Sequence, residues 1–116
     1  MLSGRRILVV EDFARLREVW VRALREVGCI VDQAGSVAEA VALEGPYDVL
    51  VLDMGLPDGR GTDVAAHWPD TPALTVSSSG GFADLMKPFG IMDLLAALEV
   101  RVAHRRDDAG HPADAR

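Results

Sequence analysis

The chain has 116 residues, of which 49% are hydrophobic and 26% charged, and this composition indicates one globular domain. Its net charge of −6 argues against a surface that binds nucleic acid directly, because such a surface needs a basic face. The single cysteine, Cys29, excludes an internal disulfide and favours a reducing, cytoplasmic location. No apolar run reaches the roughly 18–20 residues that a membrane-spanning helix needs, so we expect no membrane segment.

Five short segments rich in apolar and β-branched residues predict strands. They cover residues 7–10, 29–33, 48–52, 73–77 and 83–86. Segments of helical periodicity lie between most of them, which predicts an α/β fold with a doubly wound, five-stranded parallel sheet. In such sheets ligands bind at the carboxyl ends of the strands, so we expect the functional residues directly after the strands.

The helices are predicted from apolar spacing and from capping residues. The first carries apolar residues at helical spacing up to Gly28, namely Phe13, Leu16, Val19, Trp20, Ala23, Leu24 and Val27. We expect Trp20 to lie in the core. Ser36 is expected to cap a second helix in a capping box with Glu39, and Thr62 to cap a short third one. An amphipathic helix over 89–104 completes a domain spanning 1–104, and a disordered polar tail is expected over 105–116.

Charged residues stand directly after three of the predicted strands. Glu11 and Asp12 follow the first strand, Asp53 the third and Lys87 the fifth. Because the carboxyl ends of parallel strands meet at one edge of the sheet, we expect these side chains to converge. Clustered carboxylates repel one another unless a cation neutralises them, and Mg²⁺ prefers such oxygen ligands. An aspartate in this setting can act as the nucleophile towards a phosphoryl group.

Further motifs accompany these residues in a fixed order. Glu11-Asp12 comes first, then Asp53 followed by Leu56-Pro57 and Gly61, then Ser77, and finally Lys87-Pro88-Phe89. This order resembles the receiver domain of bacterial two-component response regulators, and the resemblance covers residues 5–104. It implies the strand order 2-1-3-4-5. It also implies phosphorelay signal transduction with a sensor histidine kinase or a phosphotransfer protein as partner, and signalling by changed protein–protein binding.

The resemblance implies roles in phosphoryl transfer for several residues. Asp53 would be the phosphoacceptor, Lys87 would pair with the phosphoryl oxygens, and the Ser77 hydroxyl would bond the phosphate. The backbone amides of Met54 and Ser78 would assist. A receiver of this kind catalyses its own phosphorylation and dephosphorylation and is not an enzyme with a separate substrate.

The same resemblance implies a Mg²⁺ site. Asp12, Asp53 and the carbonyl of Gly55 would bind the ion directly, and Glu11 would hold it mainly through water. Taken alone, Glu11 and Asp12 also fit ordinary acidic residues at the start of a helix. The third acid and the lysine favour the metal site.

Two features depart from the pattern of the receiver family. Asp84 stands three residues before Lys87, where the family usually has Tyr or Phe, and Phe82 is nearby but does not occupy that position. Only residues 78–82 separate the fourth and fifth predicted strands, so no crossover helix fits and the family's fourth helix is missing.

These departures keep a second function open, namely a pseudo-receiver that docks to partners without phosphorylation. A metal-dependent phosphatase is disfavoured, because no second acid stands two residues after Asp53. The missing helix also predicts a bare apolar face or edge at strands four and five, where Leu74 and Val76 share one face and Ala73 and Thr75 the other. An uncovered edge invites pairing, so we predict a homodimer or partner docking there.

Overall fold

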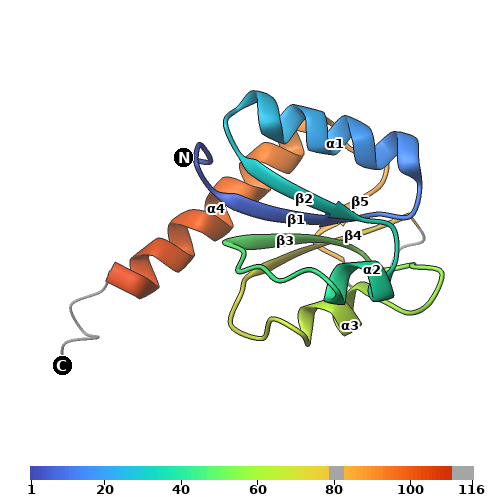
Figure 1. Ribbon diagram of the computed structural model, residues 1–116. Helices are drawn as coiled ribbons and strands as arrows, with labels where there is room; N and C mark the ends of the chain where they lie inside the picture. The colour runs from blue at the N-terminus through green and yellow to red at the C-terminus, as the bar shows by residue number, and fades with distance from the viewer. Residues whose placement is uncertain (79–82, 111–116) are drawn as a thin grey trace.

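A five-stranded parallel sheet forms the centre of the protein, and helices cover both of its faces (Figure 1). The computed structural model describes residues 1–78 and 83–110, with side chains described up to residue 103. The strands are β1 (Arg6–Val10), β2 (Ile30–Ala34), β3 (Val49–Asp53), β4 (Ala73–Ser77) and β5 (Leu85–Met86). The helices are α1 (Ala14–Glu26), α2 (Val37–Val41), α3 (Gly61–Ala65) and α4 (Ile91–Gly110). The strand order β2-β1-β3-β4-β5 confirms the predicted topology.

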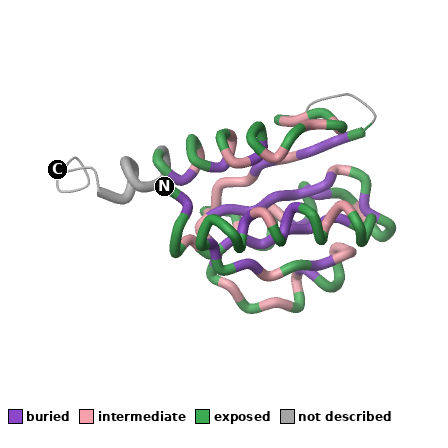
Figure 2. Tube along the Cα trace, turned by 90° about the horizontal axis from the view of Figure 1, so that it is seen from above, coloured by how far each residue is buried: buried purple, intermediate pink, exposed green. Residues whose placement is uncertain are grey.

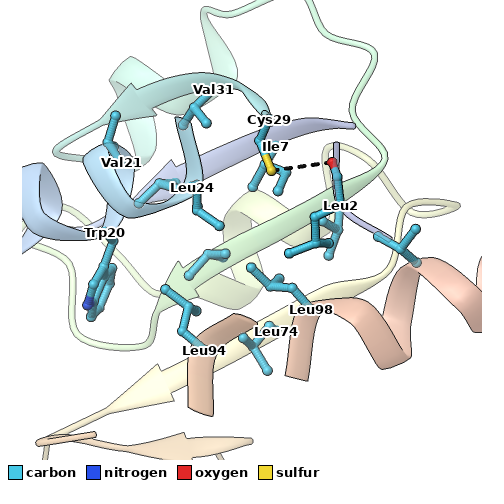
Figure 3. Packing of buried hydrophobic residues seen from close by; sticks show 14 of the residues in the cluster. Leu2, Ile7, Trp20, Val21, Leu24, Cys29, Val31, Leu74, Leu94 and Leu98 are labelled. Carbon is cyan, nitrogen blue, oxygen red and sulfur yellow. Dashed lines mark hydrogen bonds between the residues drawn. The ribbon is translucent and has the colours of Figure 1, made fainter. Parts of the chain in front are cut away.

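The two faces of the sheet bury separate apolar clusters. On one face, Trp20 and Leu24 of α1 and Leu94 and Leu98 of α4 pack against the strands, as Figure 3 shows around Leu74. On the other face, α2 and α3 cover a second cluster, whose buried members are Leu8, Val10, Ala34, Ala40, Tyr47, Leu50, Leu52, Leu56 and Val64. Burial of the strands from both sides explains why they carry near-continuous apolar runs.

The first helix has a narrower apolar face than its sequence suggests. Trp20 and Leu24 are buried, which confirms the core position of Trp20. Phe13, Val19 and Val27 were expected on the same face, but they are 61%, 51% and 41% exposed. Phe13 is the residue before the helix and Val27 the residue after it, and Val19 is not among the buried residues of the helix. Their apolar spacing is therefore not a sign of burial.

The short helices differ in how well their caps were predicted. The Ser36 hydroxyl accepts the amide of Glu39 at 3.1 Å, as expected, while the Glu39 carboxylate accepts the amide of Gly35 at 2.8 Å. The cap expected at Thr62 is wrong. Arg60 is the cap residue of α3, because the carboxylate of Asp63 accepts the Arg60 amide at 2.9 Å and fixes the start of the helix there.

Between β4 and β5, the residues that the structure describes form no helix. Residues 79–82, which include Phe82, lie outside the described residues. The last helix, α4, continues to Gly110, beyond the expected end at residue 104, and its end projects past the sheet (Figure 1). The disordered tail expected over 105–116 stays a prediction, and residues 111–116 lie outside the described part.

Exposure alternates along α4 up to residue 103, with one face turned to the sheet and the other to solvent (Figure 2). Among the described residues, no helix is both long and apolar enough to cross a membrane.

Candidate functional site: an acidic centre with one lysine

Three carboxylates meet at the carboxyl edge of the sheet. Oxygen atoms of Glu11, Asp12 and Asp53 all lie within 4.8 Å of one another. They come together because Glu11 and Asp12 follow β1, Asp53 ends β3, and these two strands are neighbours. Glu11 is completely buried and Asp53 is buried, whereas Asp12 is exposed. The convergence expected from the sequence is therefore present in the structure.

Lys87 completes this centre. Its Nζ lies 2.5 Å from Glu11 Oε1 and 3.3 Å from Asp53 Oδ2. The backbone of Lys87 is held at the end of β5, where its amide donates to the carbonyl of Ser77 at 2.7 Å. The ring of Trp20 lies 5.8 Å from the same Nζ. Lys87 thus connects β5 with the acids at the ends of β1 and β3.

The charges in this centre do not balance. Burial raises the pKa of the Glu11 carboxyl to about 7, and the neighbouring acids Asp12 and Asp53 add to the rise against the lowering effect of Lys87. Burial also works against the charged form of Lys87, but the pKa of Lys87 is raised because Glu11 and Asp53 stabilise its charge. Three acids facing one lysine leave excess negative charge, which a divalent cation would neutralise.

The buried Glu11 also fixes the turn between β1 and α1. Its Oε2 accepts the amide of Phe13 at 3.0 Å, at a helix start where no cap side chain is present. The Nη1 of Arg17 donates to the Glu11 carbonyl at 2.7 Å. This arginine, which the sequence analysis did not single out, holds the backbone of the acidic pair from the first turns of α1.

Asp53 is oriented by the loop that follows it. The amide of Gly55 donates to Asp53 Oδ1 at 3.2 Å. The start of α3 packs tightly against the same strand end, since a Cβ on Gly61 would stand 2.7 Å from the Asp53 carbonyl oxygen. No side chain fits there without a backbone shift, which explains the glycine that follows the Asp53 loop.

The expected phosphate-binding groups are only partly in place. Ser77 is buried at the end of β4, beside the exposed Ser78. The Met54 amide was expected to face the phosphate, but it donates to the Val76 carbonyl at 2.9 Å. The ladder between β3 and β4 extends one residue past Asp53 and occupies this amide. The Gly55 amide is the one that reaches the Asp53 carboxylate.

A second carboxylate–cation group, missed by the sequence analysis, lies at the outer edge of β4. Asp84 Oδ2 accepts the amide of Thr75 at 2.8 Å and its hydroxyl at 3.0 Å, and the Asp84 amide donates to the Thr75 hydroxyl at 3.0 Å. Asp84 Oδ1 lies 2.9 Å from Arg101 Nη2, and Arg101 Nε donates to the carbonyl of Ala73 at 3.0 Å. The only sequence signal was an acid at a position where an aromatic residue was expected.

The residues of β4 do not form the bare apolar face that the sequence predicts. Leu74 and Val76 are fully buried in the cluster beneath α4. The opposite face of β4 carries Ala73 and Thr75, which are half-buried, so the described residues of β4 offer no bare apolar face. In β5, Met86 is 45% exposed.

Comparisons with known proteins agree with this geometry. The family model described as "Response regulator receiver domain" matches residues 7–99. The transcriptional regulatory protein TcrA of Mycobacterium tuberculosis is 36% identical over 131 aligned positions, covering 96% of this chain and 50% of TcrA. CusR of Escherichia coli is 33% identical, covering 90% of this chain and 53% of CusR. The chain thus spans about half the length of the curated relatives it matches.

Solved structures resemble the chain over most of its length. The receiver domain of HemR from Leptospira biflexa has a TM-score of 0.75 at 31% identity, covering 85% of this chain and 94% of that domain. TrrA from Thermotoga maritima, in complex with Mg²⁺-BeF, has a TM-score of 0.74 at 26% identity, covering 84% of this chain and 98% of TrrA. A CheY-like receiver domain from Methanospirillum hungatei has a TM-score of 0.83 at 22% identity, covering 91% of this chain and 99% of that domain. At this identity the likeness shows the fold alone.

Proposed function

Because this chain belongs to the response regulator receiver domain family, we propose that it accepts a phosphoryl group on Asp53 in a Mg²⁺-dependent reaction. The observation that carries the proposal is the acidic centre itself: three carboxylates within 4.8 Å, with a lysine amine 3.3 Å from Asp53 Oδ2. The donor would be a histidine kinase or a phosphotransfer protein, and the signal a change in protein–protein binding. A cytoplasmic location is part of this proposal, since such donors act there.

The residues present fit a magnesium ion. Three carboxylates form a hard oxygen donor set, and the raised pKa of buried Glu11 reflects charge that a divalent cation would relieve. Asp12 and Asp53 would hold the ion directly with the Gly55 carbonyl, and Glu11 through water. When bound, Mg²⁺ supplies charge neutralisation to the transferring phosphoryl group.

The chain's own residues account for the rest of the reaction. An Asp53 carboxylate oxygen attacks phosphorus, the new P–O bond forms, and the bond from phosphorus to the donor nitrogen breaks with its electron pair leaving on the imidazole. The Gly55 amide holds Asp53 Oδ1 and thereby orients the nucleophile. Lys87 neutralises charge on the phosphoryl oxygens from its position beside Oδ2. The Ser77 hydroxyl and the Ser78 amide, from the end of β4, would bind the remaining oxygens.

The test is direct phosphorylation by acetyl phosphate with Mg²⁺, read by intact mass. We expect one phosphoryl group on the wild-type chain, none on Asp53→Asn, and none without Mg²⁺. Phosphate that persists on Asp53→Asn would place the acceptor elsewhere.

A pseudo-receiver is the second candidate function. Two observations favour it: Asp84 stands where the family has an aromatic residue, and β4 leads to β5 without a helix in the described chain. Titration with beryllofluoride and Mg²⁺, followed by NMR of backbone amides, separates the two functions. A phosphorylatable receiver gives saturable shifts at Asp53 and Lys87, and a pseudo-receiver gives none.

A homodimer through β4 and β5 stays a prediction. The bare apolar edge from which it was inferred carries polar contacts of Asp84 and Arg101, and these contacts weaken the inference. Light scattering over a concentration series tests it. TcrA and CusR are named as transcriptional regulators, but this chain spans only about half of each, so transcriptional control is not carried over to it.

A further inference from the structure

The fifth strand, β5, is unusually short for a strand that positions the site lysine, Lys87. It pairs with β4 through only two residue pairs, Val76↔Leu85 and Ser77↔Met86. Strands in globular proteins usually have about five or six residues. Lys87 follows directly, so the position of the site lysine depends on a strand with very little ladder of its own.

Side chains satisfy the part of the β4 edge that β5 leaves unpaired. The Thr75 amide, which a longer neighbouring strand would accept, donates instead to Asp84 Oδ2. The Ala73 carbonyl accepts Nε of Arg101 from α4. Backbone groups that lack a partner are costly when they are removed from water, so these contacts stand in for missing strand pairing.

Asp84 connects these two contacts, because it binds both the Thr75 amide and the arginine that reaches the Ala73 carbonyl. Its second oxygen pairs with Arg101, so one carboxylate connects β4, the approach to β5 and α4. Burial works against ionisation, but the bonds from Thr75 and the charge of Arg101 prevail and lower the pKa of Asp84. The side chain therefore stays ionised at neutral pH, as the ion pair requires.

We propose that Asp84, with Thr75 and Arg101, forms a latch that holds β5 in register and thereby positions Lys87 against Asp53. Asp84 is a positioning residue in this proposal, which rests on the proposed function for its catalytic consequence. The register is pinned at both ends of β5: by Asp84 on Thr75 before the strand and by the Lys87 amide on the Ser77 carbonyl after it.

Without the contact between Asp84 and Thr75, the two residue pairs between β4 and β5 are left to resist a shift of strand register. A slip by one residue moves the chain by about 3.3 Å and turns every side chain to the other face of the sheet. Lys87 Nζ now lies 3.3 Å from Asp53 Oδ2, and displacement on that scale removes it from the phosphoryl oxygens. Misplacement by about 1 Å can cost on the order of a hundredfold in rate.

The experiment compares Asp84→Ala and Thr75→Val with Thr75→Ser, which keeps the hydroxyl, and with Glu26→Gln, which makes the same charge change at the exposed end of α1. The rate of phosphorylation by acetyl phosphate and the Mg²⁺ affinity are measured separately for each variant. We expect Asp84→Ala to slow phosphorylation by about tenfold or more. Thr75→Val should slow it less, and Thr75→Ser and Glu26→Gln should leave it unchanged.

Mg²⁺ affinity should not fall in any of the four variants, because the acids that bind the ion follow β1 and end β3 and do not depend on β5. Amide hydrogen exchange gives a readout without activity: in Asp84→Ala, the Lys87 amide should lose protection while the Met54 amide keeps it. Wild-type rates in Asp84→Ala, or a parallel loss of Mg²⁺ affinity, would overturn the latch. A wild-type chain that accepts no phosphate would instead overturn the proposed function, and hydrogen exchange at Lys87 would still decide the latch.

Discussion

The protein has two carboxylate–cation groups, the acidic centre with Lys87 and the Asp84–Arg101 pair at the β4 edge, and the pKa values of Glu11 in the first and of Asp84 in the second are shifted in opposite directions. In the acidic centre, burial raises the pKa of Glu11 to about 7, and three acids share one lysine. At the β4 edge, the pKa of Asp84 is lowered despite burial, because Thr75 donates two hydrogen bonds and Arg101 supplies a matching charge.

The group at the β4 edge is balanced in charge and stabilises the fold, whereas the acidic centre has a charge imbalance that a bound cation would relieve. The latch, formed by Asp84, Thr75 and Arg101, is locally complete, and its charges cancel. The acidic centre carries excess negative charge in a buried setting, which destabilises the metal-free protein and favours cation binding. Variants should therefore affect the two groups in opposite directions: removing charge from the centre should stabilise the metal-free fold, and removing it from the latch should destabilise the fold.

The largest effect is expected at the nucleophile. Asp53→Asn should reduce phosphorylation below detection, because an amide cannot form the acyl phosphate, while the nearly identical shape preserves the fold. Intact mass after acetyl phosphate treatment measures the first, and circular dichroism the second. In metal-free buffer the variant should also be more stable than the wild type, because one of three like charges is lost; a lower melting temperature would contradict the charge imbalance.

Mg²⁺ should stabilise the wild type strongly. At a concentration a hundredfold above its Kd, the free energy of unfolding should rise by about 2.7 kcal/mol. Asp12→Ala should remove most of this gain, since it deletes the exposed member of the acidic triad. Denaturant unfolding with and without Mg²⁺ is the measurement, with Glu26→Gln as the charge control. Equal gains in Asp12→Ala and wild type would exclude Asp12 as a ligand.

The pH dependence of the metal-free protein should report Glu11. Its folded pKa of about 7 lies above the ordinary value of 4.5, so the native state holds a proton that the unfolded state has released. Stability should therefore be greatest below about pH 4.5 for this group and be lost as pH rises through about 7, by on the order of 3 kcal/mol. Glu11→Gln should remove this slope. A wild-type slope that survives the substitution would assign it to another group.

The smallest effect is expected at the latch, with the opposite pH direction. A double-mutant cycle of Asp84→Asn and Arg101→Gln should give a coupling free energy of about 0.5–1 kcal/mol, because both side chains are partly exposed. The folded pKa of Asp84 is lowered, so this stabilisation should be present above its ordinary pKa and lost as pH falls through the lower folded value. Zero coupling at neutral pH would mean that the ion pair adds nothing to the hydrogen bonds of Thr75.

Much of the acidic centre was predictable because its residues obey local rules. Glu11, Asp53 and Lys87 each follow an apolar strand, and parallel strands bring such positions to one edge whatever the details of packing. The Ser36 cap was predictable for the same reason, since its partner Glu39 is three residues away. The resemblance to receiver domains supplied the strand order, which local patterns alone do not determine.

The sequence by itself therefore determined the strands, their order through the family resemblance, and the acids and lysine of the centre. Only the tertiary structure decided that the Met54 amide is occupied by Val76, that Val19 faces solvent, and that Asp84 finds Thr75 and Arg101. These contacts depend on how far a ladder extends and how a helix is rotated, and they join residues from three separate elements. No spacing in the chain encodes them, because each is the outcome of packing all the elements together.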